Sequence, residues 1–150
     1  MATTISNATL TVTISEDITL NSTQQGGTVT QTISNINEVD RRIFTAPTSE
    51  VDIIGFDGSA NSMGTYLNTA VKYIRITNLD DSNFVTLGVS DTGSDTFFVK
   101  LEAGQSFFMG NDDLEIHATG GASSAFSQAD NISAKADTAS VDLEIFVAST

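Results

Sequence analysis

Four short apolar runs between residues 72 and 109 constrain the fold of this chain more than any other feature of its sequence. Turn residues separate the runs at intervals of roughly ten positions, the spacing of strands in antiparallel sandwiches and barrels. The runs occupy residues 72–80, 83–89, 96–101 and 105–109. This segment therefore predicts an all-β fold.

The rest of the chain repeats the strand pattern. Leu10, Val12 and Ile14 alternate with hydroxyl-bearing residues, and a two-residue period also marks residues 28–36 and 141–147. We expect one domain over residues 1–150, an antiparallel, jelly-roll-like β-sandwich with about eight to ten strands and no substantial helix. Residues 129–140 are small and polar, and they predict only an edge strand at 132–134.

The N-terminal part of the chain has two interpretations. Residues 21–27 are polar and end in two glycines, which is typical of a flexible connection or a hairpin tip. Residues 1–26 are therefore either a first strand of the same sandwich or an arm that engages a neighbouring subunit. The N-terminus has no basic segment and no long apolar stretch, so we expect no signal peptide.

The charge balance argues against two classes of partner. The net charge is −13 with six basic residues, so we expect no nucleic acid partner, because phosphate backbones require clustered Lys and Arg. The same charge disfavours anionic lipid, and no apolar run approaches the roughly 18 residues of a membrane span. The chain has no cysteine and hence neither disulfides nor thiolate metal ligands. Its negative charge favours solubility and association with a basic protein surface.

A series of strand and turn motifs fills the second half of the chain. A strand ending in Asn-Leu (74–80) precedes a Gly-containing strand (84–89), a strand leading to an Ala-Gly turn (97–104) and an aromatic strand (106–108). Small residues at 134–137 and an alternating strand at 141–145 close the series. Over roughly residues 71–148 the pattern resembles small β-sandwich virion proteins of tailed bacteriophages. Ala103 stands where proline is common in that family, which leaves the turn less rigid.

The resemblance implies a structural, non-enzymatic role on the head or tail of a phage particle. We expect a capsid decoration (cement) protein on the outer surface of the head, made in the host cytoplasm and bound to major capsid proteins. It would form homo-oligomers, with a trimer as the working assumption. The alternative is a neck, tail or fibre-associated component of the particle, including a carbohydrate-binding module. We expect no catalytic residues, no cofactor and no metal site.

Asp91-Thr-Gly is a segment that matches a catalytic motif, that of the aspartic proteases. Those enzymes also resemble one another in a later strand of two aliphatic residues followed by glycine. Here the corresponding Ile53-Ile-Gly precedes the aspartate. A hairpin turn between two apolar runs explains the same residues, and the protease remains only a competing interpretation.

Several loops gather Asp and Asn side chains, which supply the oxygen ligands that Ca²⁺ prefers. Solvated turns are the simpler interpretation, because no loop completes the EF-hand pattern. A cation bridge at residues 80–83 or 111–113 stays open as the alternative. His117 is the only histidine, which argues against a His-based metal site. The acidic groups are Asp57/Asn61, Asp80/Asp81/Asn83, Asp91/Asp95 and Asn111/Asp112/Asp113.

One basic dipeptide and two Phe pairs are the candidate interface residues. The arginines either pair with acidic groups of a partner or neutralise carboxylates of their own chain. Each Phe pair places one ring on each face of a strand, so one ring of each pair should join the core. The other is then exposed, or is covered by a loop or another subunit. These residues are Arg41, Arg42, Phe97, Phe98, Phe107 and Phe108.

Overall fold

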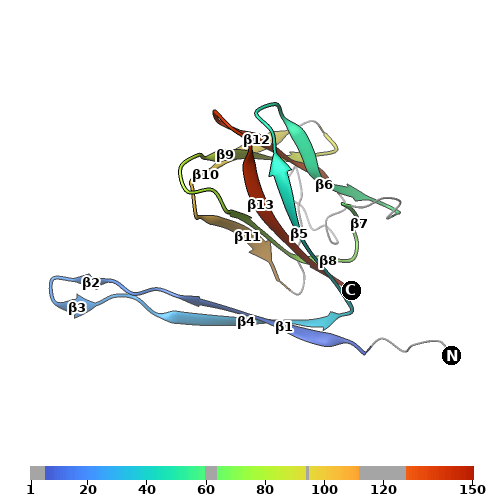
Figure 1. Ribbon diagram of the computed structural model, residues 1–150. Helices are drawn as coiled ribbons and strands as arrows, with labels where there is room; N and C mark the ends of the chain where they lie inside the picture. The colour runs from blue at the N-terminus through green and yellow to red at the C-terminus, as the bar shows by residue number, and fades with distance from the viewer. Residues whose placement is uncertain (1–5, 60–63, 94, 112–127) are drawn as a thin grey trace.

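The computed structural model describes residues 6–59, 64–93, 95–111 and 128–150, which form a long β-hairpin arm and a sandwich of two sheets (Figure 1). The arm contains β1 (Ala8–Ser15), β2 (Thr19–Leu20), β3 (Thr23–Gln24) and β4 (Thr28–Ile36). The sandwich contains β5 (Glu38–Ala46), β6 (Val51–Asp57), β7 (Thr65–Leu67), β8 (Val71–Asn78), β9 (Val85–Asp91), β10 (Thr96–Leu101), β11 (Ser106–Gly110), β12 (Ala129–Ala136) and β13 (Val141–Ser149).

The sandwich has the strand order of a jelly roll. One sheet runs β10-β9-β12-β6-β7 and the other runs β11-β8-β13-β5. Successive strands mostly alternate between the sheets, and the first and last strands of the sandwich, β5 and β13, are neighbours. All pairs are antiparallel except β6 with the short β7. The predicted all-β, jelly-roll-like sandwich is confirmed, and the described residues contain no helix.

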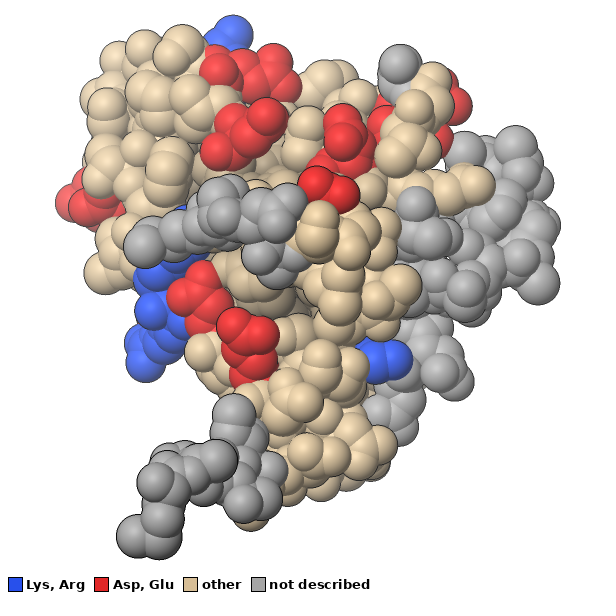
Figure 2. All heavy atoms as spheres, turned by 90° about the vertical axis from the view of Figure 1, so that its right-hand side faces the viewer, with Lys and Arg blue, Asp and Glu red and all other residues tan. Residues whose placement is uncertain are grey.

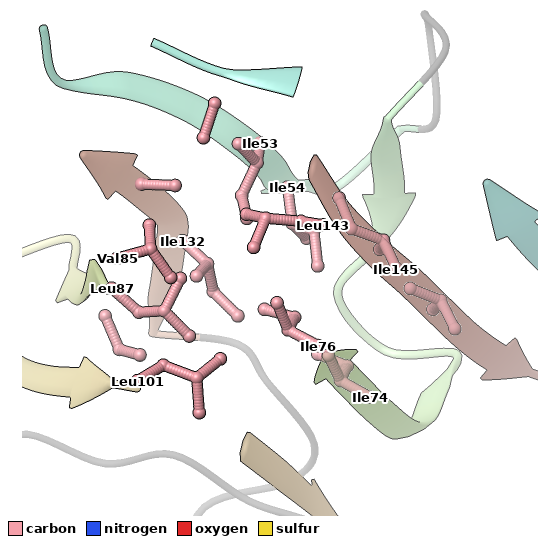
Figure 3. Packing of buried hydrophobic residues seen from close by; sticks show 14 of the residues in the cluster. Ile53, Ile54, Ile74, Ile76, Val85, Leu87, Leu101, Ile132, Leu143 and Ile145 are labelled. Atoms are coloured by element: carbon pink, nitrogen blue, oxygen red, sulfur yellow. The ribbon is translucent and has the colours of Figure 1, made fainter. Parts of the chain in front are cut away.

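The core lies between the two sheets and is built mainly from aliphatic side chains (Figure 3). Alternate residues of β8 and β13 point into it, which leaves the residues between them on the outer face of their sheet. We call this surface of β11-β8-β13-β5 the outer face. The largest fully buried side chains of the core are Ile54, Ile74, Ile76, Leu87, Ile132, Leu143, Ile145, Val71, Val85 and Val141.

Strand β12 corrects one expectation. The sequence predicted an edge strand at 132–134, but β12 lies between β9 and β6 in the middle of its sheet. Its residues Ala129, Ala134 and Ala136 are buried together with Ile132. Small side chains suit a central strand when larger neighbours fill the space around them. The low hydrophobicity of this segment concealed its burial.

The arm is separate from both sheets of the sandwich. Within the described residues, β1 pairs only with β4, and the tip strands β2 and β3 pair with each other. Asn21 and Ser22 turn the chain with φ angles of 50° and 63°, the positive values that a two-residue type I′ turn requires. Residues 8–26 thus supply one side and the tip of the arm, and the other side continues to Ile36.

Asn78 joins two turns at one end of the sandwich. Its buried Nδ2 donates to the carbonyl oxygens of Asn83 at 2.9 Å and Leu101 at 3.2 Å. Its Oδ1 accepts a hydrogen bond from the amide of Asp80, and its carbonyl accepts one from the amide of Gly104. The Asn-Leu and Ala-Gly segments of the sequence pattern therefore meet around one buried amide.

Candidate functional site

The arm has one hydroxyl face and one apolar face. Residues that lie opposite each other on β1 and β4 share a face of the ribbon. The hydroxyl face pairs Thr11 with Thr32, Thr13 with Thr30 and Ser15 with Thr28. The apolar face pairs Leu10 with Ile33, Val12 with Gln31 and Ile14 with Val29. We call this second set the apolar stripe.

The base of the arm packs its apolar stripe on the outer face of its own sandwich. Ile33 and Ile36 are buried in one cluster with Tyr73 of β8 and Ala148 of β13. Leu10, Val12 and Phe146 surround this cluster. A pocket of about 260 Å³ remains between β1 and the sheet, lined by Leu10, Thr11, Val12, Thr13, Tyr73, Arg75 and Phe146. The arm base is thus fixed to the sandwich by apolar contact.

Gln31 marks the point where the arm leaves the sandwich. Its Nε2 donates to the carbonyl oxygen of Gly110, at the end of edge strand β11, over 2.9 Å. Gly110 pairs with Tyr73, and a Cβ at Gly110 would lie 2.6 Å from the Tyr73 ring. Glycine at this position therefore allows Tyr73 and the arm to lie close together.

Beyond Gln31 the apolar stripe continues without a cover from the described residues. Figure 1 shows the distal half of the hairpin extending well past the sandwich. Val29 is 65% exposed and Leu20 60% exposed, and Ile14 and Ile18 are also exposed. At about 3.3 Å per residue, the strands reach roughly 25 Å beyond the β11 edge. We call Ile14, Ile18, Leu20 and Val29 the distal stripe.

A second uncovered strip lies on the outer face, along the opposite edge strand β5. Val39, Arg41 and Ile43 pair with Ala148, Phe146 and Glu144, which all point away from the core. Val39 is 56% exposed and Ile43 is 67% exposed. We call Val39, Arg41 and Ile43 the β5 strip.

Two arginines hold Glu144 on the outer face. Arg41 donates through Nη2 to Oε2 at 2.5 Å, and Arg75 donates through Nη2 to Oε1 at 2.5 Å. The hydrogen bonds from Arg41 and Arg75 hold the pKa of the Glu144 carboxyl below its usual value. The guanidinium of Arg75 also lies 5.8 Å from the centre of the Phe146 ring. In this chain the exposed Arg41 therefore neutralises a carboxylate of its own sheet.

Arg42 points to the other side of β5, toward the gap between the edges of the two sheets. Its Nη2 donates to the carbonyl oxygen of Ile53 at 2.5 Å, and its Nε lies 3.7 Å from Asp40. The hydroxyl of Tyr66 donates to Asp40. Burial and this hydrogen bond raise the pKa of Tyr66 above its usual value. Arg41 and Arg42 are adjacent in the sequence, but Arg41 lies on the outer face and Arg42 lies on the opposite side of β5.

The four phenylalanines do not divide as expected. Phe107 packs against the core and Phe108 is exposed on the outer face, as predicted for one pair. Phe97 and Phe98 are both exposed, so the expectation that one of them joins the core is wrong. They lie on edge strand β10, where Leu101 at the far end contributes the fully inserted side chain.

Asp80 and Asp91, two of the acidic residues with a proposed chemical role, close turns. Asp91 Oδ1 accepts the amide hydrogens of Gly93 at 2.9 Å and Asp95 at 2.7 Å. Asp80 Oδ1 accepts those of Ser82 and Asn83, and these bonds lower the pKa of Asp80. No group of three metal-binding side chains occurs among the described residues. Asn61, Asp112, Asp113 and His117 lie outside the described residues.

On the face shown in Figure 2, acidic side chains are spread over several elements, while basic side chains form only small separate groups. No helix within the described ranges is long and apolar enough to cross a membrane. No protein-family model, curated protein or solved structure matches the chain.

The distal stripe is the feature that sequence reasoning missed. The sequence predicts strands at residues 8–20 and 28–36, with either a flexible connection or a hairpin tip at 21–27 between them, but it does not predict that the apolar face of such a hairpin extends past the sandwich. Their shared alternation of Thr with aliphatic residues, mirrored about Asn21 and Ser22, is the signal that could have revealed one long amphipathic hairpin.

Proposed function

We propose that this chain is a non-enzymatic structural protein of a bacteriophage particle, a decoration protein on the outside of the capsid that binds major capsid proteins. The observation that carries the proposal is the arm. A long ribbon whose apolar face extends past its own domain is suited to contact with other protein molecules.

The energetics of the arm support this role. An isolated two-stranded hairpin is at best marginally stable in water, and no strand among the described residues lies beneath the distal stripe. Covering one large aliphatic side chain contributes about 1.5–3 kcal/mol. A surface that covers Ile18, Leu20 and Val29 would therefore stabilise both the hairpin and the assembly that it joins.

Other features of the chain support an additive structural role. The jelly roll is an architecture that viral capsid domains use. Asp80 and Asp91 are committed to closing turns, which is a structural use of carboxylates. Many symmetric copies, each with a modest contact, would lower the free energy of a closed shell relative to an opened one.

Immunogold labelling of particles made by the genome that encodes this chain tests the proposal. Label spread over the whole head is expected. Label confined to one vertex or to the tail would replace the proposal with a neck or tail component. Particles that carry no label although the protein is expressed would contradict both.

Phe98 favours a second candidate function, a carbohydrate-binding component of the tail or fibres. Its ring is 64% exposed and lies over Gly88, 3.0 Å from where a Cβ would stand. Ser133, which donates to Glu50 at 2.7 Å, also lies beside Gly88. Lectin domains are another use of the jelly roll. This candidate would be supported if the protein binds glycans and if Phe98→Ala abolishes that binding. The control variant Leu79→Ala should bind as the wild type does.

A further inference from the structure

We infer that the distal stripe of one copy of this chain docks on the β5 strip of a second copy, so that the copies associate head to tail. The inference rests on the proposed role of the arm as an assembly contact. It names the partner surface, which the proposed function leaves open.

The first argument for this contact is the direction in which the arm runs. The chain enters β5 directly after the arm, through Asn37, whose amide donates to the carbonyl oxygen of Ser149. From that edge the arm crosses Ala148 of β13 and Tyr73 of β8 and reaches Gly110 of β11. The distal stripe therefore lies beyond the β11 edge, whereas the β5 strip lies at the opposite edge of the same sheet. The arm cannot cover the β5 strip of its own sandwich.

The second argument is that the distal stripe and the β5 strip each continue a surface that is already in contact at the arm base. The arm base already demonstrates the fit, because its apolar stripe buries Ile33 against the outer face at Ala148. Val39 is the β5 partner of Ala148, so the β5 strip extends the same row of the same face. Ile14 and Val29 of the distal stripe lie on the same side of the ribbon as the arm base, and the pairing of Leu20 with Thr23 at the tip continues their register. A second copy, placed with its β5 edge beside the β11 edge of the first, presents to the distal stripe a surface of the kind that the arm base already covers.

The third argument is that the arm and the β5 strip carry opposite charges. Residues 8–36 contain two charged side chains, Glu16 and Asp17, and both are acidic. They fall between Ile14 and Ile18 of the distal stripe. Arg41, whose side chain is largely exposed, falls between Val39 and Ile43 of the β5 strip. Because Arg41 shares the single carboxylate of Glu144 with Arg75, the group keeps a net positive charge. Each surface thus has the order apolar, charged, apolar, with opposite signs of charge.

Because the second copy lies with its β5 edge beside the β11 edge of the first, the two copies use opposite edges of the sheet, and this placement fixes the class of assembly. A contact of this heterologous type repeats from copy to copy, and it gives either a closed ring or an open filament. A dimer closed by two identical arm-to-arm contacts is not compatible with it.

Disulfide trapping tests the contact directly, because the chain has no cysteine of its own. Two single variants, Ile18→Cys and Ile43→Cys, are made with tags of different mass and mixed under oxidising conditions. Ile43 and Ile18 are exposed, so both variants should fold. The expected product is the mixed disulfide. In the control, Leu79→Cys replaces Ile43→Cys. Leu79 is an exposed aliphatic residue directly after β8, and this pair of variants should give only background disulfide.

Sedimentation over a concentration series gives the second measurement. Ile43→Asp should weaken self-association by about tenfold or more, because it places a carboxylate in an apolar contact that faces Glu16 and Asp17. Leu79→Asp should leave self-association unchanged. Disulfides formed only between identical variants, or a wild type that stays monomeric throughout the series, would overturn the inference. If the protein is a monomer and immunogold label still covers phage heads, the inference fails and the proposed function stands. If the protein forms a ring and particles carry no label, the proposed function fails and the inference stands.

Discussion

Ile33 and Ile36 are three residues apart on strand β4, and yet both are buried in one cluster against the outer face. Regular alternation would send them to opposite sides of the ribbon. Asn35, with a φ of 62°, lies at a register shift between the pairs Ala8–Ile36 and Leu10–Ile33. This bulge turns both side chains toward the sandwich and so fixes the arm to it.

Asn35 is therefore expected to be sensitive to substitution by a branched residue. Asn35→Val should lower the free energy of unfolding by about 1–2 kcal/mol, because the left-handed region is costly for residues with a bulky Cβ. Asn35→Gly, which adopts positive φ without strain, is the matched control and should change stability by only a few tenths of a kcal/mol. Urea denaturation of both variants measures the difference, and equal stabilities would refute the role of this bulge.

The two glycines near the arm tip predict a contrast between adjacent positions. A Cβ at Gly26 would lie 2.0 Å from the carbonyl oxygen of Glu16, whereas nothing lies within 4 Å of one at Gly27. Gly26→Ala should break the bonds of the tip, in which the amides of Glu16 and Gln25 donate to Gly27 and Ile18. Amide hydrogen exchange should show faster exchange at both donors. Gly27→Ala should leave the exchange rates of these two amides unchanged. Identical exchange in the two variants would contradict the close contact between Gly26 and Glu16.

Asn78 should contribute more to stability than its position at a strand end suggests. Asn78→Asp removes the donor to the carbonyl oxygens of Asn83 and Leu101 inside a buried site. We expect a loss of about 2–3 kcal/mol in the free energy of unfolding at neutral pH. Asn37→Ala changes an exposed side chain and should cost less than about 0.5 kcal/mol. A loss at Asn78 as small as at Asn37 would show that the two turns are held by other contacts.

Glu144 predicts a pH dependence of stability. Its folded-state pKa is lowered by Arg41 and Arg75, so the ionised carboxylate stabilises the fold fully above the unfolded-state pKa of about 4.3. That contribution is lost as the pH falls through the folded-state pKa. The difference in unfolding free energy between wild type and Glu144→Gln should be largest near neutral pH and shrink at low pH. A difference that does not vary with pH would contradict this. Glu102→Gln, which removes an exposed ion pair with Lys100, should have little effect at neutral pH.

The sequence predicted the sandwich because its strands alternate in period two and its turns are rich in Gly, Asn and Asp. It did not predict where β12 lies, because alanines such as Ala134 give no hydrophobic signal, although they are fully buried. The pairing of Arg41 with Glu144 joins residues 103 positions apart, a separation that local patterns do not register. The exposure of Phe97 depends on the edge position of β10, which only the sheet order reveals.

The extent of the arm was hidden for a different reason. Asn35 interrupts the alternation of β4, so Ile33 and Ile36 do not appear in the sequence as members of one face. The turn at Asn21 and Ser22 lacks the Asn-Gly pair that most strongly indicates a two-residue hairpin. A flexible connection at residues 21–27 was therefore an equally reasonable interpretation.

Thiol labelling of Ile18→Cys in assembled phage particles and in the dissociated protein tests the central claim most directly, because it adds the single cysteine of the chain at the distal stripe. Burial of the stripe by neighbouring protein predicts slow labelling in the particle and fast labelling after dissociation. Equal and fast labelling in both states would show that the arm remains uncovered, and would contradict its role in assembly.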